Sequence, residues 1–480
     1  YICILYELIQ SKYISTAHCK IIIQTIPTNR CSTKEMGSLR EANIDTSGNS
    51  NPISYHEIVG RAAKVLPGGV LGRHLYPAVL EHVPISGKGA WIIDHTGREY
   101  LDYSCGGGSL ILGYSHPAIV KAVRDQVEHA TQFISILNIP ALQLAETIKE
   151  LVSWADMVRF ALSGAEAVMF ALRMARAATG REKIIKFDGA YHGNSDYALW
   201  NAAPNAPAGN PTMQPESAGI PHAIQNLVLV APYNDIETIR SVVQREWRDI
   251  AAIIVEPVQR YYAAETAFLE TLRQLCNDHG IVMIYDEVVT GFRHALGGAA
   301  EITGIEPDLS VFGKALGGGL PISAVAGKMR VMSHGDPHRE GAQDGYCYVT
   351  SSQAGNPLGC AAALATLTEL AKPGVIKTFH ETAETLKAGL RDVVRKSGVV
   401  AQVVGVGPLW DIVFTDTKIC DSLSAASADG HKHQKFHLGL VDQGVMVRVG
   451  GRSYFSTSHG KREVEFTLQA AAAALKLADK

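Results

Sequence analysis

From residue 53 onward, short apolar runs rich in β-branched residues alternate with segments in which apolar residues recur every three or four positions. The first pattern is typical of buried strands and the second of amphipathic helices. Strands that alternate with helices in this way predict a parallel sheet joined by crossover helices, and hence an α/β fold. The expected strands are 183–187, 227–230, 252–255, 281–285 and 309–312, and helices such as 164–177 and 267–278 lie between them.

Beyond residue 355 the pattern changes to long stretches rich in Ala and Leu, such as 360–370 and 379–395. A second region with mixed helix and strand patterns follows and ends in 464–477. This change predicts a smaller C-terminal domain. The segment 204–219, which is rich in Pro, Gly, Ala and Asn, is expected to form a long surface loop.

The composition favours an ordinary enzyme whose partner is a small molecule. Of the 480 residues, 46% are hydrophobic and 19% charged, and the formal net charge is -3. Such a chain has no basic field for nucleic acid or anionic lipid. The eight cysteines form no CxxC pair, which argues against a zinc site and against a disulfide framework. We therefore expect reduced thiols in a cytoplasmic protein.

The first 35 residues carry apolar runs that Ser11, Lys12 and His18 interrupt. These runs are too short to span a bilayer. The stretch also lacks the continuous apolar core of a secretory signal and the arginines of a mitochondrial presequence. We expect the working chain to start near Met36 and the preceding residues to be a leader outside the fold.

A lysine stands at the end of an apolar strand pattern, in the segment 308–319 (DLSVFGKALGGG). Lys314 follows Gly313 and precedes a triple glycine, so we expect it on a turn at a strand end, where open α/β sheets bind their ligands. An amine in a partly desolvated site can lose its proton and attack an aldehyde, as Schiff-base lysines do. Taken alone, the same pattern also describes a surface lysine beside a glycine turn.

A second strand, 281–285, delivers Asp286 and Glu287 to its carboxyl end. A carboxylate there can hold a pyridine nitrogen in its protonated form through a charge-assisted hydrogen bond. A pair of helix-capping acids is the alternative interpretation.

Two more turns add candidate binding groups. The segment 163–165 (SGA) begins a helix whose free amide groups and dipole favour a phosphate, although an ordinary helix cap has the same sequence. Tyr191 follows the strand 183–187, where an aromatic ring can stack on a planar cofactor or simply pack in the core or at the surface.

In this order and spacing, the motifs resemble the class III aminotransferases of fold type I, and most closely their glutamate-1-semialdehyde aminomutase-like branch. The likeness runs from about Tyr55 to Leu477 and includes 64–70 (KVLPGGV), 100–103 (YLDY), 112–123 (LGYSHPAIVKAV), 233–237, 253–258 and 353–358. It implies a large domain with a mostly parallel sheet flanked by helices, and a smaller α+β domain built from both chain ends. The implied division is a leader at 1–45, an N-terminal segment of the small domain at 46–115, the large cofactor-binding domain at 116–350 and the C-terminal small domain at 351–480.

The resemblance implies pyridoxal 5'-phosphate as the cofactor, bound as a Schiff base to Lys314. Asp286 then matches the partner of the pyridine nitrogen, and Val288 and Tyr191 match the residues on the two faces of the ring. The phosphate-binding turn corresponds to Ser163, Gly164 and Ala165.

Two matches carry departures from the family pattern. Ala165 stands where the family usually has threonine, so one hydroxyl contact is missing while the backbone donors remain. Ser352 matches a threonine that reaches the phosphate from the neighbouring subunit, which implies a homodimer with shared active sites. Glu256 and Asn234 fall at positions near the cofactor, where each is equally well a buried structural group. His192, beside the stacking tyrosine, is expected to be a packing or loop residue.

The substrate is predicted from departures from the aminomutase pattern. Gly107 stands where that branch carries an active-site tryptophan, which should open the pocket, and Gly451 or Arg452 stands where it carries a glutamate. Arg73 and Arg452 are candidates for binding a substrate carboxylate, unless both are solvated surface charges. We expect a transaminase that moves an amino group between an amine or β/ω-amino acid and a keto acid in two half-reactions. The alternatives are an intramolecular transfer like that of the aminomutase, which needs no added keto acid, and a binding protein without activity.

Overall fold

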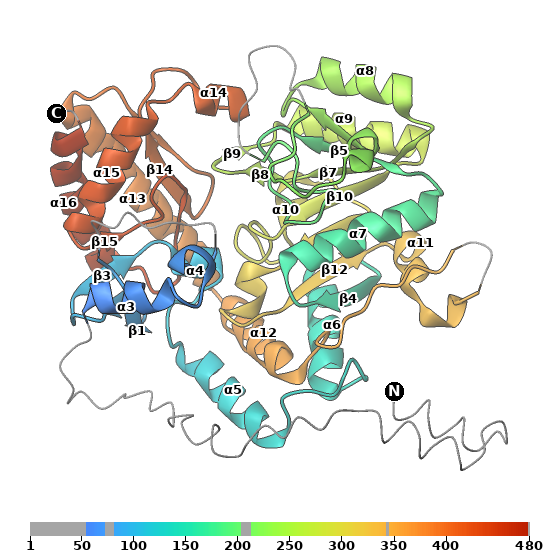
Figure 1. Ribbon diagram of the computed structural model, residues 1–480, viewed down its shortest axis with the longest axis horizontal. Helices are drawn as coiled ribbons and strands as arrows, with labels where there is room; N and C mark the ends of the chain where they lie inside the picture. Colours follow the sequence, from blue (N-terminus) through green and yellow to red (C-terminus); the bar gives the residue numbers. More distant parts are fainter. Residues whose placement is uncertain (1–53, 73–80, 203–212, 342–344, 479–480) are drawn as a thin grey trace, which may run out of the picture. The chain divides into compact units, whose positions relative to one another are not determined.

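A seven-stranded sheet forms the centre of the computed structural model, which describes residues 54–72, 81–202, 213–341 and 345–478 (Figure 1). Its strand order is β4 (Met157–Ala161), β12 (Ser323–Gly327), β11 (Leu309–Phe312), β10 (Val282–Glu287), β7 (Ile250–Val255), β5 (Lys183–Phe187) and β6 (Val228–Ala231). Neighbouring strands are parallel except in the two pairs that β12 makes. The predicted α/β fold is thereby confirmed, and the five expected strands lie within two residues of their expected ends.

Helices cover both faces of this sheet because its strands are apolar on both sides. The crossover helices include α7 (Gly164–Thr179), α8 (Ile236–Glu246) and α9 (Thr266–His279). Successive side chains of a strand point to opposite faces. Along β10, Val282 and Ile284 pack into the core that contains α7, whereas Met283 and Tyr285 pack into the core that contains α9. Burial on both faces explains why these strands read as continuous apolar runs.

Strands from both ends of the described chain share a second sheet. Its order is β1 (Pro84–Lys88), β2 (Trp91–Asp94), β3 (Glu99–Asp102) and β15 (Val445–Met446), and β15 runs parallel to β3. A third sheet contains β13 (Gln402–Val404), β14 (Leu409–Val413) and β16 (Ser453–Tyr454). The pairing of β3 with β15 supports the expected contribution of 46–115 to a C-terminal domain, while the boundaries at 116 and 351 stay predictions.

Long helices bury the faces of these smaller sheets. They are α13 (Val375–Ser397), α15 (Gly430–Asp442) and α16 (Lys461–Ala478), which share one apolar core with β14 and β3. That core continues into α5 (Pro117–His129), α6 (Ile139–Leu151) and α12 (Pro357–Leu370). The shorter elements are α3 (Tyr55–Ala62), α4 (Cys105–Gly108), β8 (Val258–Gln259), β9 (Tyr262–Ala263), α10 (Ala299–Thr303), α11 (Met329–Met332), α14 (Ser422–Ala426) and the 3-10 turns η1 (Pro67–Gly69), η3 (His222–Leu227), η4 (Lys314–Gly317), η5 (Ser333–Gly335) and η6 (Pro337–Arg339).

Several predictions fall outside the described residues. These are the leader at 1–45, the candidate Arg73 and most of the expected loop at 204–219. Among the helices that are described, none combines the length and the apolar character that crossing a membrane requires. The cysteines at 105, 276, 347, 360 and 420 are free thiols, and all but Cys420 are buried.

Candidate active site

Lys314 lies at the carboxyl end of β11, at the first position of η4. Its backbone has a positive φ of 43°, a conformation that residues other than glycine rarely adopt. The preceding Gly313 leaves room for this turn, since a Cβ there would lie 2.9 Å from Ser323 Oγ. Lys314 is half-buried, and desolvation lowers the pKa of its amine. A lysine in this state is readily available as an uncharged nucleophile.

Asp286 and Glu287 end β10 and point into different surroundings. Asp286 accepts a hydrogen bond from His192 Nδ1 at 2.7 Å and one from the Val288 amide at 3.1 Å. Glu287 is fully buried and bonds to Ser310 Oγ at 3.0 Å, and burial raises its pKa to about 7. Position at the strand end makes both acids candidates, but the charge of Asp286 acts on Lys314, whereas Glu287 is bonded within the core.

The pairing with Asp286 revises the expectation for His192. The ring is 1% exposed, and its Nε2 is buried without a hydrogen-bond partner among the described residues. His192 therefore does more than pack in a loop, because it fixes the orientation of the Asp286 carboxylate. The partner of this histidine is 94 residues away in the sequence, which is why a local motif did not reveal it.

The segment Ser163–Ala165 forms the start of α7, as expected. Ser163 Oγ accepts the Glu166 amide at 3.2 Å, and Glu166 in turn accepts the Leu162 amide at 2.6 Å. Within the described part of the chain, the amides of Gly164 and Ala165 donate no hydrogen bond. A helix start with free amides is a favourable site for a phosphate.

Two glycines bring neighbouring turns into close contact at this helix start. A Cβ on Gly164 would lie 2.9 Å from Val288 Cγ2, and a Cβ on Gly193 would lie 2.7 Å from both Ala165 Cα and Cβ. Such distances are shorter than van der Waals contact. The turns after β4, β5 and β10 therefore meet only because these two side chains are absent. Gly193 was not singled out from the sequence.

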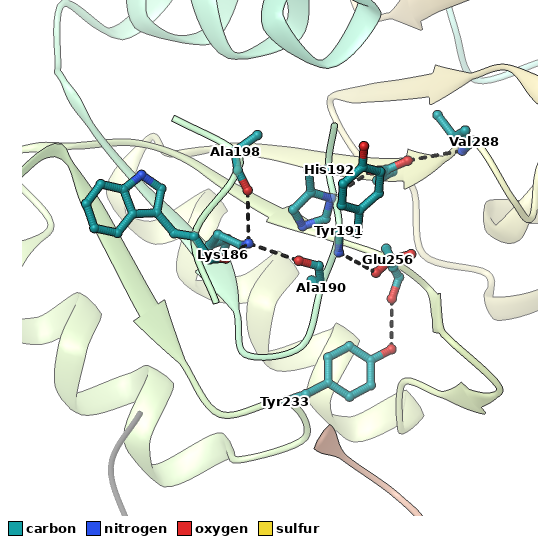
Figure 2. Close-up of polar contacts among 10 residues, drawn as sticks. Lys186, Ala190, Tyr191, His192, Ala198, Tyr233, Glu256 and Val288 are labelled. Carbon is teal, nitrogen blue, oxygen red and sulfur yellow. Dashed lines mark hydrogen bonds and ion pairs between the residues drawn. The ribbon is translucent and has the colours of Figure 1, made fainter. Parts of the chain in front are cut away.

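A buried lysine donates hydrogen bonds to the loop that carries Tyr191 and His192 (Figure 2). Lys186 is fully buried in β5, and its Nζ donates to the carbonyl oxygens of Ala190 at 2.9 Å, Ala198 at 3.0 Å and Trp200. Desolvation lowers its pKa to about 7. Lys186 thus holds both ends of this loop against the strand.

The backbone of Tyr191 contacts Glu256, the residue that follows β7 (Figure 2). The Tyr191 amide donates to Glu256 Oε2 at 3.3 Å, and the tyrosine ring remains 53% exposed. An accessible ring is what stacking on a bound cofactor requires. Burial raises the pKa of Glu256, although the charges of Arg452 and His192 oppose the shift.

A pair formed by Arg452 and Tyr454 completes the surroundings of Lys314. Arg452 Nε donates to the Tyr454 hydroxyl at 2.9 Å, and its Nη1 donates to the Arg260 carbonyl at 2.6 Å. Burial would raise the pKa of Tyr454, but the charges of Arg452 and Lys314 lower it to about 8. The sequence did not single out Tyr454, because its two-residue strand β16 has no recognisable period.

Gly107 lies in α4, a glycine-rich turn next to this pair. A Cβ on Gly108 would lie 2.6 Å from the Tyr454 ring, whereas one on Gly107 would meet nothing within 4 Å. The carbonyl of Gly108 accepts a hydrogen bond from the buried Arg293. A side chain at Gly107 would therefore enter open space, and the expected opening of the pocket there stays a prediction.

Two predicted residues have no contact with this cluster in the described structure. Asn234 uses its side chain to bind the backbone of Ala263, Cys420 and Glu265, so the structural alternative for this residue is favoured. Ser352 is exposed, and its carbonyl accepts a hydrogen bond from Gln132. Its expected reach into a neighbouring subunit stays a prediction.

Known proteins resemble this chain in both sequence and fold. A family model described as aminotransferase class-III matches residues 77–458. A glutamate-1-semialdehyde 2,1-aminomutase of Pelotomaculum thermopropionicum is 39% identical over 428 residues, which are 87% of this chain and 96% of the relative. One of Thermodesulfovibrio yellowstonii is 35% identical over 420 residues, with coverages of 86% and 96%.

Solved structures with the same fold include transaminases. An omega-transaminase from Sphaerobacter thermophilus superposes with a TM-score of 0.84 at 33% identity and covers 91% of this chain and 100% of its own. A transaminase with bound PLP has a TM-score of 0.79 at 30% identity, with coverages of 88% and 96%.

Proposed function

Because the chain belongs to the class-III aminotransferase family, whose cofactor is pyridoxal phosphate, we propose that it moves an amino group on a small substrate bearing a carboxylate. The observation that carries this proposal is the half-buried Lys314 amine, whose pKa is lowered chiefly by desolvation and also responds to the charges of Tyr454, Arg452 and Asp286. A reactive amine, a carboxylate and a guanidinium thus meet at one place.

The residues of the site fit pyridoxal phosphate. Lys314 supplies the amine that its aldehyde needs, and Asp286, oriented by His192, supplies the carboxylate for the pyridine nitrogen. The free amides at the start of α7 suit the phosphate, and Gly164 and Gly193 leave the close cradle that a Cβ would fill. This fit supports the proposed roles of these residues.

When bound, pyridoxal phosphate supplies a ring that accepts electrons from a substrate carbon. Lys314 would hold the group through Nζ, and once the substrate amine had displaced it, the freed Nζ would take the proton from the substrate carbon and return it to a neighbouring position. Asp286 keeps the ring nitrogen protonated through a charge-assisted hydrogen bond. The helix start of α7 holds the phosphate while Lys314 is free to carry the proton.

Arg452 is the proposed binding group for the substrate carboxylate. Its Nε and Nη1 already donate to Tyr454 and Arg260, whereas Nη2 makes no hydrogen bond within the described chain. The side chain is partly accessible, so a carboxylate can approach the remaining donors. Fixed guanidinium donors match carboxylate geometry better than a flexible ammonium does.

The comparisons favour an amino transfer within one molecule over the transfer between two molecules that the sequence predicted. Both curated relatives are named glutamate-1-semialdehyde 2,1-aminomutase and match nearly their whole length. We therefore place first an intramolecular exchange between neighbouring carbons of an amino aldehyde acid. Transfer to a separate keto acid is the second candidate, which the space beside Gly107 and the charge of Arg452 support.

Dependence on a keto acid distinguishes the two reactions. Purified enzyme with bound cofactor is given glutamate 1-semialdehyde alone, and separately β-phenylalanine with and without pyruvate or 2-oxoglutarate. Turnover of the semialdehyde without acceptor supports the first candidate. Turnover of the β-amino acid only with acceptor supports the second. Absence of both, in a protein whose visible absorbance does not respond to any amine, would contradict the proposed function.

We also propose that the active site is completed in a homodimer. Residues 133–142 expose the large apolar side chains of Phe133, Ile134, Ile136, Leu137, Ile139 and Leu142. Ser135 of this segment donates to the Ser351 carbonyl, and the preceding Gln132 donates to the Ser352 carbonyl. Exposed apolar patches of this kind mark interaction surfaces. Sedimentation of Leu137→Asp should give a monomer without activity, and an active monomer would contradict the proposal.

A further inference from the structure

Three ionisable side chains lie together beneath the loop that carries Arg452. Asp411 belongs to β14, and His433 and His437 lie one turn apart on α15. His437 Nε2 lies 2.9 Å from Asp411 Oδ1, and His433 Nε2 lies 3.0 Å from Asp411 Oδ2. Asp411 and His437 are fully buried. No step of the proposed reaction uses these residues.

The hydrogen bonds of His437 determine which ring nitrogen carries its proton. The Gly450 amide donates to His437 Nδ1 at 3.0 Å, so Nδ1 acts as an acceptor. Nε2 then carries the proton and donates it to Asp411. Asp411 also accepts the Ile412 amide at 2.8 Å, and both histidines help to lower its pKa against the effect of burial, so it is ionised.

This proton arrangement argues against a metal ion at the cluster, although its ligand atoms lie within 4.8 Å of one another. A histidine that binds a metal through Nε2 normally donates a hydrogen bond from Nδ1. At His437 the Nδ1 atom accepts one instead. The cluster is therefore better described as a hydrogen-bonded relay from Asp411 through His437 to Gly450.

The end of this relay is two residues from Arg452. Gly450 has a φ of 72°, and the connection between β15 and β16 contains a second glycine, Gly451. Adjacent glycines make a connection flexible unless it is tied to a neighbour. A further tie is at the far end, where Ser453 pairs with Trp410, the residue before Asp411.

We propose that His437, oriented by Asp411, is a positioning residue that holds the Gly450 loop and thereby fixes Arg452 against Tyr454. The resulting contribution to carboxylate binding rests on the proposed function, whereas the placement of Arg452 does not. His437 acts through the backbone of the loop, since its ring bonds to Gly450 and not to Arg452.

The ionisation of Tyr454 reports the placement of Arg452 without any substrate. The enzyme with bound cofactor is titrated by ultraviolet absorbance, and the signal of Tyr454 is obtained by subtracting the same protein with Tyr454→Phe. His437→Phe should raise the Tyr454 pKa by about one unit or more, because the Arg452 charge is no longer held beside the hydroxyl. His437→Asn, which keeps an acceptor near the Nδ1 position, should restore most of the wild-type value.

His433→Phe is the matched control. It removes the other histidine that bonds to the Asp411 carboxylate but leaves the Gly450 bond intact, so the Tyr454 pKa should stay within about 0.3 units. Equal shifts in His437→Phe and His433→Phe, or no shift in either, would overturn the proposal. Stoichiometric zinc in the purified enzyme would overturn it as well.

A measurement on the unaltered enzyme guards against a variant that fails to fold. Nitrogen NMR of histidine-labelled protein should show one ring with a protonated Nε2 and an unprotonated, hydrogen-bonded Nδ1, and this signal should be missing in His437→Asn. The opposite tautomer would overturn the proposal.

The variant Arg452→Ala distinguishes a failure of the proposed function from a failure of this inference. If that change leaves the KM for the carboxylate substrate unaltered, the carboxylate assignment fails. If it raises KM while His437→Phe changes neither KM nor the Tyr454 pKa, the inference fails.

Discussion

Lys186 offers the sharpest test of how the loop that carries Tyr191 and His192 is held in place. Replacing it by Met keeps the length of the side chain and removes the donor from the carbonyls of Ala190, Ala198 and Trp200. A buried acceptor without a partner costs about 1–3 kcal/mol, so the gross loss is roughly 3–9 kcal/mol. Part of it is offset because Met carries no charge that must be buried.

The free-energy cost of burying the Lys186 charge depends on pH, and the direction of this dependence can be measured. The pKa of Lys186 is lowered to about 7 in the folded protein, against about 10.4 for an unfolded lysine. Between these values the unfolded chain binds more protons, so the stability of the wild type rises with pH. The difference in unfolding free energy between wild type and Lys186→Met should therefore grow by about 2 kcal/mol from pH 7 to pH 9.

Lys183→Met is the matched control on the same strand. Lys183 is partly exposed and pairs with Glu246 at 2.8 Å and Asp249 at 3.0 Å, and such pairs contribute about 0–1 kcal/mol. Urea unfolding followed by fluorescence measures stability, and titration of the visible absorbance measures cofactor affinity. Lys186→Met should weaken both and Lys183→Met neither. Equal effects, or a difference that does not grow with pH, would refute the reasoning.

Three further changes test the site. Asp286→Asn should retain the cofactor but slow proton abstraction at least about 100-fold in stopped-flow absorbance, and an unchanged rate would remove Asp286 from its proposed role. In the cofactor-free protein one tyrosine should ionise near pH 8, the lowered pKa of Tyr454. This ionisation should be absent from Tyr454→Phe and should move to a higher pH in Arg452→Ala. Its presence in Tyr454→Phe would contradict the assignment to Tyr454. Gly164→Ala places a Cβ 2.9 Å from Val288 Cγ2, so cofactor affinity measured by dialysis should fall about tenfold or more, whereas wild-type affinity would show that the cradle is not close-packed.

The fold and the chemical centre could be predicted because their signals are local. Strands buried on both faces appear as continuous apolar runs, and the residue that follows such a run lies at the carboxyl edge of the sheet. Lys314 follows β11 and Asp286 is the last residue but one of β10, so position made both of them candidates and the family resemblance supplied their expected roles.

The supporting residues could not be found in this way because their partners are distant in the sequence. His192 meets Asp286 across 94 residues, and Arg452 meets Arg260 across 192. Lys186 did leave a signal, a charged residue inside the buried strand 183–187. A charge in such a strand is costly unless it is bonded, so it indicated a buried partner without identifying it. The position near the cofactor expected for Asn234 follows from the family resemblance, and the sequence does not show the three backbone groups that bind its side chain.

Reductive trapping tests most directly whether Lys314 carries the cofactor. The enzyme with bound pyridoxal phosphate is reduced with borohydride, digested and analysed by mass spectrometry. We predict a phosphopyridoxyl group on the peptide that contains Lys314, and no modified peptide from Lys314→Ala. Modification of another lysine at the same stoichiometry, or an unmodified Lys314 in a protein that binds the cofactor, would contradict the account.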